Sequence, residues 1–254
     1  TIAAAGREMR NSCVITNEEG WYKKALDTDL ARPKFAIMNP EITYTLPDYQ
    51  TQCGCADIMM HTMERYFVLE DTMEITDKIA QDVMKNVMKY AKILKKDPEN
   101  YEARAEIMWC GSLSHNGLTG CGTCGGDWAT HLIEHELGGM FDVAHGAGLA
   151  AVWGSWARYV MDEKPERFAQ FAVDVMGVEE SDDVKSTALK GIEAVEEFYR
   201  MIEMPTNMKE LGINPTDEQI KDMAMKATNH DTQQLGAFKK LSAKDLVEIY
   251  KTAK

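Results

Sequence analysis

The spacing of apolar residues after Pro40 is the feature that most constrains the fold of this chain. Between residues 77 and 94, apolar side chains recur every three or four positions, which places them on one face of an α-helix. Further along the chain, two later helix starts show capping-box spacing. These are Thr216 with Gln219, and Ser242 with Asp245. Counting periods and breakers, we predict roughly eight or nine helices after Pro40.

The first forty residues have a different pattern. SCVITNE at residues 12–18 and KFAIMN at residues 34–39 are short β-branched or apolar runs bounded by Asn, Pro and Gly. Runs of this kind are typical of strands. The sequence therefore predicts a mainly α protein in two parts, a strand-containing segment over residues 1–40 and an all-helical domain over residues 41–254.

Composition excludes several classes of partner. The 254 residues carry a formal net charge of −13 at pH 7. A negative surface repels phosphate, so we expect neither nucleic acid nor an anionic membrane as a partner. No apolar run approaches the ~18 residues of a transmembrane helix, and no secretory signal is recognisable. Six cysteines are too few for a disulfide scaffold, and we expect a cytoplasmic protein.

Histidine is scarce, and four of the six histidines fall in two clusters. In the first cluster, Asp57 and His61 are four residues apart on a predicted helix. Both side chains therefore leave the same face, one turn apart. A carboxylate and an imidazole so placed can hold a divalent metal, although a hydrogen-bonded pair in the core is the commoner arrangement.

The second cluster lies in HLIEHELGGMFDVAH, residues 131–145. His131 and His135 repeat the spacing of four. His145 follows Gly138-Gly139, a pair that we expect to end the helix and return His145 toward His131. Buried, hydrogen-bonded histidines remain the structural alternative to a metal site.

The same stretch contains H-x-x-E-H, a zinc-protease motif. Under that interpretation His131 and His135 are zinc ligands and Glu134 is the general base. The motif is short, however, and it leaves Asp57, His61 and His145 without a role.

Two other patterns carry no function. GCGTCG at residues 120–125 matches G-x-G-x-x-G, but it follows a predicted helix rather than a strand, so we reject it as a nucleotide loop. Cys121 and Cys124 within it lack a second pair and are expected to be free thiols. His115 and His230 have no charged partner at ligand spacing and receive no role.

Longer segments resemble the iron-containing (group III) alcohol dehydrogenases, most closely their butanol dehydrogenase and aldehyde reductase branch. The resemblance lies in Asp57-x-x-x-His61 with its flanks, RPKFAIMNPEITYTLPDYQTQCGCADIMMHTMERYF, and in NYEARAEIMWCGSLSHNGL and GDWATHLIEHELGGMFDVAHGAGLA. It implies a multi-helical, dehydroquinate-synthase-like C-terminal domain. A short β-containing remnant of an α/β nucleotide-binding domain would precede it.

The resemblance assigns roles to the histidines. It implies that Asp57, His61, His131 and His145 bind the metal. His135 would face the nicotinamide and the substrate, as a proton relay or substrate contact with an imidazole pKa near neutrality. Under this assignment Glu134 falls off the site, which removes the protease interpretation.

The N-terminal segment departs from the family pattern. Thr1, Gly6 and Lys23 match positions that the resemblance places near the dinucleotide. At Ala5, Arg7 and Arg10, however, the family usually has Thr, Ser and Asn. The Gly-rich phosphate loop of relatives is absent from these residues, so we expect a fragment that folds but turns over poorly by itself.

The implied function is hydride transfer between NAD or NADP and a small alcohol or aldehyde bound to a divalent metal. Imidazole and carboxylate ligands suit Fe²⁺, Zn²⁺ or Ni²⁺. The resemblance also implies a homodimer. The alternatives are the zinc metallopeptidase and a non-catalytic metal-binding helical domain.

Overall fold

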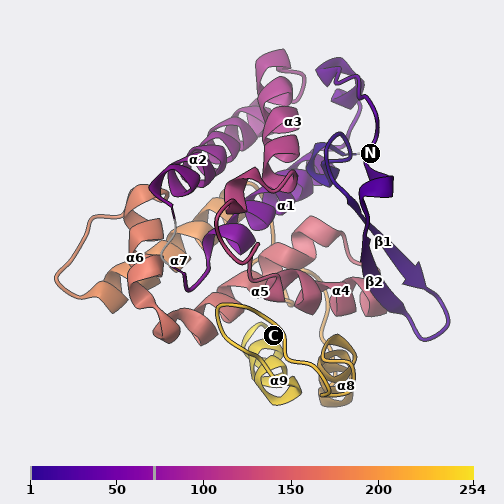
Figure 1. The fold of residues 1–254 in the computed structure, drawn as a ribbon, viewed down its shortest axis with the longest axis vertical. Helices are drawn as coiled ribbons and strands as arrows, with labels where there is room; N and C mark the ends of the chain where they lie inside the picture. The colour runs from indigo at the N-terminus through magenta and orange to yellow at the C-terminus, as the bar shows by residue number, and fades with distance from the viewer. Residues whose placement is uncertain (1, 71–72) are drawn as a thin grey trace.

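The computed structural model describes residues 2–70 and 73–254. The predicted mainly α fold is confirmed, with nine α-helices among the described residues (Figure 1). The helices are α1 (Asp48–Tyr66), α2 (Glu74–Lys96), α3 (Tyr101–His115), α4 (Ala129–Phe141), α5 (His145–Val160), α6 (Pro165–Asp174), α7 (Val184–Met201), α8 (Asp217–Ala227) and α9 (Ala243–Thr252). No helix of the described ranges is long and apolar enough to cross a membrane.

Two antiparallel strands form a hairpin on one side of the helices, β1 (Ser12–Asn17) and β2 (Tyr22–Asp27) (Figure 1). The first predicted strand is confirmed. The second prediction, over residues 34–39, is wrong because that segment has no strand partner and is mostly exposed. A strand needs a neighbour for its backbone hydrogen bonds, and the neighbour of β1 is YKKALD, residues 22–27. The two lysines interrupt the alternation of apolar residues by which a strand is recognised in sequence. The domain boundary at residue 40 stays a prediction.

Helix α1 is the centre of the fold. Every residue from Thr51 to Tyr66 is buried, and α2, α3 and α5 pack against the helix. A helix that is covered on all sides belongs to the core of a protein, and its polar residues then need partners inside the protein. The polar groups on α1 are therefore the first place to look for a site.

A short connection joins α4 to α5, but it does not begin at Gly138-Gly139, where we predicted the end of the helix. Gly138 and Gly139 lie inside α4, which continues to Phe141 and ends at Asp142 in the left-handed conformation, φ 52°. Gly139 is needed for a close approach instead. A Cβ there would lie 2.8 Å from the carbonyl oxygen of Trp21, so the missing side chain lets the hairpin rest on α4.

A second close approach fixes the start of α5. A Cβ at Gly146 would lie 1.9 Å from the carbonyl oxygen of Cys53 on α1, so no other residue fits there. This contact draws the N-terminus of α5, and with it His145, against α1. Further along the chain, the two predicted capping boxes, at Thr216 and Ser242, are both present.

A buried ion pair joins α6 to α2 and α1. Arg167 donates from both terminal nitrogens to the carboxylate of Asp77, at 2.6 and 2.7 Å. Its Nε and Nη2 also donate to the carbonyl oxygen of Tyr66. Its guanidinium also lies over the Tyr66 ring. Arg167 is 5% exposed and Asp77 is 7% exposed, so removing one partner leaves a charge in the interior.

We expect Arg167→Gln to lower the free energy of unfolding by about 3–5 kcal/mol, because Asp77 then loses its buried counter-charge. Urea denaturation measures the change. Arg158→Gln is the matched control, because Arg158 pairs with Glu196 at the surface and should change stability by about 1 kcal/mol or less. Equal effects of the two variants would contradict a special role for the buried pair.

Glu136 on α4 gives the fold a pH dependence. Burial raises the pKa of Glu136 to about 7, although Lys24 and Lys226 partly offset it. Because the folded-state pKa lies above the ordinary value, the folded state favours the protonated form. The free energy of unfolding therefore falls as pH rises from the ordinary pKa toward about 7.

We expect Glu136→Gln to remove this dependence. The variant should gain on the order of 2 kcal/mol at pH 8 and match the parent near pH 4.5. Urea midpoints at the two pH values measure it, with the exposed Glu197→Gln as control. A constant difference between Glu136→Gln and the parent at both pH values would contradict the assignment.

Candidate metal centre

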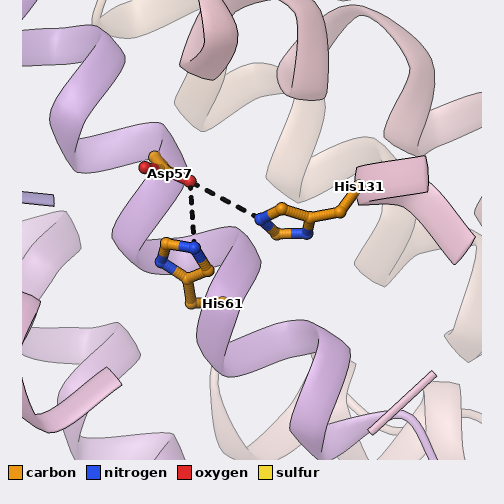
Figure 2. Close-up of side chains that lie close together, drawn as sticks. All are labelled: Asp57, His61 and His131. Carbon is orange, nitrogen blue, oxygen red and sulfur yellow. Dashed lines mark ion pairs between the residues drawn. The ribbon is translucent and has the colours of Figure 1, made fainter. Parts of the chain in front are cut away.

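Three helices bring the four predicted ligands together. Asp57 and His61 lie one turn apart on α1, His131 comes from the first turn of α4, and His145 begins α5. Asp57 Oδ1 lies 3.4 Å from His61 Nε2, 3.6 Å from His131 Nε2 and 3.7 Å from His145 Nε2. Figure 2 shows the first two of these contacts, with both imidazoles facing the same carboxylate oxygen. The structure thus places around one point the four residues that the family pattern implied.

The donor atoms fit a metal ion. Asp57 Oδ1 and His131 Nε2 are buried and have no hydrogen-bond partner among the residues that the structure describes, which is costly unless a cation satisfies them. Ligand atoms 2.0–2.2 Å from a tetrahedral metal lie about 3.4 Å from one another, close to the observed separations. One carboxylate oxygen and three imidazole nitrogens suit iron, zinc or nickel.

Two buried carboxylates orient two of the imidazoles. Glu64 Oε1 lies 3.0 Å from His131 Nδ1 and also accepts a hydrogen bond from the His131 backbone N–H. Glu134 Oε2 contacts His145 Nδ1 and pairs with Lys23 Nζ at 3.3 Å. A carboxylate at Nδ1 fixes the tautomer so that Nε2 is free to bind a metal. The prediction that Glu134 falls off the site is therefore wrong.

The pKa values follow from these contacts. Burial would raise the pKa of Glu134, but His145 and Lys23 outweigh it and lower the pKa to about 2. Burial likewise lowers the pKa of His131, but the nearby carboxylates of Asp57 and Glu64 outweigh it and raise the pKa to about 9. The surroundings of His131 therefore favour a positive charge near Nε2, which a bound metal ion would supply.

His135 lies beside the donor set, its ring centroid 5.7 Å from that of His145. Burial lowers its pKa to about 3, so the ring is neutral near pH 7 rather than titrating there as we expected. The protease interpretation finds no support in this arrangement. His131 joins Asp57, and Glu134 is held by His145 and Lys23 instead of standing free as a base.

A cavity of about 680 Å³ opens beside the donor set. The four donor residues and His135 form one wall, and the hairpin side contributes Arg10, Ser12 and Lys23. Of the positions matched to cofactor binding, Lys23 therefore lines the cavity. Gly6 is buried against His115 and does not line the cavity, and Thr1 lies outside the described residues. Of the departures from the family pattern, Ala5 and Arg10 line the cavity, whereas Arg7 is exposed.

Two residues of the site escaped the sequence analysis. His115, at the end of α3, lies with its ring centroid 3.9 Å from that of His61, and burial lowers its pKa to about 3. Nothing in its spacing indicated this contact, because it depends on how α3 packs. Glu64 could have been found, since it lies seven residues after Asp57 and therefore on the same face of α1.

Glu64→Gln and Glu134→Gln are each expected to lower metal affinity about 10–100-fold, because a neutral amide orients and polarises the imidazole less than a carboxylate does. Competition with a chelator of known affinity measures the change. Glu106→Gln, on α3 and away from the cavity, is the control. Unchanged affinity in both site variants would contradict the role given to the carboxylates.

Comparison with known proteins identifies the family. Residues 51–254 match the Fe-containing alcohol dehydrogenase family, C-terminal. The chain is 34% identical over 252 residues to NADH-dependent butanol dehydrogenase A of Clostridium acetobutylicum, covering 99% of this chain and 64% of that protein. It is 31% identical over 255 residues to the NADPH-dependent aldehyde reductase YqhD of Escherichia coli, covering 100% and 65%.

A solved structure agrees. The crystal structure of NADH-dependent butanol dehydrogenase A from Thermotoga maritima superposes with a TM-score of 0.93 at 35% identity, over 100% of this chain and 64% of that one. The chain therefore spans a little under two thirds of the length of these relatives. Because the family match covers most of its residues, the chain belongs to the Fe-containing alcohol dehydrogenase family.

Proposed function

We propose that this chain carries the metal centre of an alcohol dehydrogenase or aldehyde reductase that uses NAD(H) or NADP(H). The observation that supports it most is the convergence of three imidazole nitrogens on Asp57 Oδ1, within 3.7 Å. Relatives are named for both NADH and NADPH and for butanol and aldehydes. We take a small alcohol or aldehyde as the substrate class.

Asp57, His61, His131 and His145 would hold the metal, with Fe²⁺ as first choice and Zn²⁺ or Ni²⁺ as alternatives. Such a metal supplies Lewis acidity, which favours the charge that develops on a substrate oxygen during hydride transfer. The nicotinamide supplies or accepts the hydride, which no side chain can do. Glu64 and Glu134 keep two of the imidazoles in place.

His135 would act on the substrate from the cavity wall. Because its low pKa keeps the ring neutral, it can accept a hydrogen bond at one nitrogen and donate one at the other. We assign it to orienting the substrate hydroxyl or carbonyl and to passing its proton. Lys23 lines the same cavity. We keep it, with Thr1 and Gly6, as a predicted cofactor contact, and we keep the implied homodimer as a prediction for analytical ultracentrifugation.

We expect His61→Ala and His145→Ala to lose most of the bound metal, and His135→Ala to keep it, because His135 stands outside the donor set. Metal content after dialysis is measured by plasma mass spectrometry. The metallopeptidase alternative predicts the reverse, with metal lost in His135→Ala. Full metal content in both His61→Ala and His145→Ala would overturn the proposed ligand set.

Catalysis is tested by aldehyde-dependent oxidation of NADH or NADPH, in the chain and in the intact polypeptide that contains it. His135→Ala is expected to lower kcat about 10²–10⁴-fold, the usual loss for a group that assists proton transfer. A metal-loaded intact polypeptide that is inert toward a broad panel of aldehydes and alcohols with both cofactors would favour the non-catalytic alternative.

A further inference from the structure

Arg10 is a cation that lines the cavity but has no role in the metal centre. It precedes β1 and lines the same cavity as Asp57 and His135. Among the described residues, no carboxylate lies within ion-pair distance of it. The nearest negative groups act only at longer range, namely Asp57, which faces the metal donors, and Asp27, which is exposed.

The hydrogen bonds of Arg10 leave part of its guanidinium free. Nε and Nη2 donate to Ser12 Oγ, at 3.1 and 2.7 Å, and Nη1 donates to the carbonyl oxygen of Ala5 at 3.2 Å. A guanidinium has five N–H groups, so one on each terminal nitrogen has no partner among the described residues. The bonds also fix the plane of the group, which removes the entropy cost of ordering it for a ligand.

The electrostatic setting favours an anion. Burial lowers the pKa of Arg10, and Arg7 nearby lowers it further, while Asp57, Cys13 and Asp27 partly offset this. The other cations of the cavity are already engaged. Lys23 pairs with Glu134, and Arg65 donates to the carbonyl oxygens of His61 and Ser114 while lying over the Trp128 ring. Among the described cations of the cavity, Arg10 therefore has neither a carboxylate partner, as Lys23 has, nor an aromatic ring beneath it, as Arg65 has.

We propose that Arg10 binds a carboxylate on the substrate, so that the preferred substrates are short alcohols or aldehydes with a carboxylate at the end remote from the reacting carbon. A planar guanidinium with two free N–H groups matches a carboxylate, and charge-assisted hydrogen bonds of this kind are about twice as strong as neutral ones. This inference rests on the proposed function for the identity of the reacting end. The phosphates of the dinucleotide share the same chemistry and are the competing source.

Calorimetric titration separates the two sources without requiring turnover. The metal-loaded chain is titrated with short ω-hydroxy acids of increasing length, each compared with the diol of the same length. We expect one hydroxy acid to bind about ten-fold or more tightly than its diol. Arg10→Gln should abolish that preference and leave diol binding unchanged, and Arg10→Lys should keep part of it.

Arg7→Gln is the matched control. Arg7 carries the same charge three residues before Arg10, but its side chain is exposed and does not line the cavity. Thermal unfolding of each variant identifies a purely structural role, in which stability falls and the preference for the hydroxy acid remains. That result overturns the proposal. So does a preference that survives in Arg10→Gln, because the metal would then be holding the carboxylate.

Titration with inorganic pyrophosphate and ADP tests the dinucleotide as the source. Weaker binding of these probes in Arg10→Gln, without any hydroxy acid preference in the parent, assigns Arg10 to the cofactor and overturns the substrate assignment. Failure of the proposed function is recognised separately, by loss of metal binding at the donor set. The hydroxy acid and diol titrations repeated on metal-free chain keep the test of Arg10 independent of that outcome.

Discussion

The structure depends on one buried carboxylate oxygen, Asp57 Oδ1, that faces three imidazole nitrogens. Among the described residues, Asp57 Oδ1 and His131 Nε2 have no hydrogen-bond partner, a buried arrangement that is costly unless a cation lies between them. The surrounding charges agree. Asp57, Glu64 and Glu134 are three buried carboxylates, and a divalent metal together with Lys23 would balance their charge. The raised pKa of His131 has the same cause, because the nearby carboxylates favour a positive charge and a proton can supply it.

Packing elsewhere serves this convergence. Ligands from three helices can meet only if α1 is buried on all sides and α5 starts against it. Gly146 permits that start, because any side chain would collide with the Cys53 carbonyl. Gly139 permits the hairpin to rest on α4, and the hairpin then brings Lys23 to Glu134. The strands are few, but they supply one wall of the cavity and a charge that the centre needs.

The sequence could predict what depends on local spacing. Asp57 with His61 follows from the helical period, as do the stripe on α2 and the capping boxes at Thr216 and Ser242. It could not predict what depends on tertiary approach. From the sequence, Gly139 is interpreted as part of a helix end, and nothing in the sequence indicates its contact with the hairpin. Strand β2 is recognisable only through its pairing with β1. His115 reaches His61 through the packing of α3, which no spacing reveals.

The H-x-x-E-H stretch shows why a motif needs its structural context. Its residues can in principle form a zinc-protease site, with Glu134 as a base between two zinc ligands. In this fold His131 Nε2 faces Asp57 Oδ1. Glu134 contacts His145 Nδ1, and the pKa of Glu134 is lowered to about 2. A carboxylate held by a lysine and an imidazole N–H is a poor base at neutral pH, whatever the motif around it. His145 and Lys23 lie on other elements than Glu134, and their contacts with its carboxylate determine that Glu134 supports a ligand instead of acting as a base.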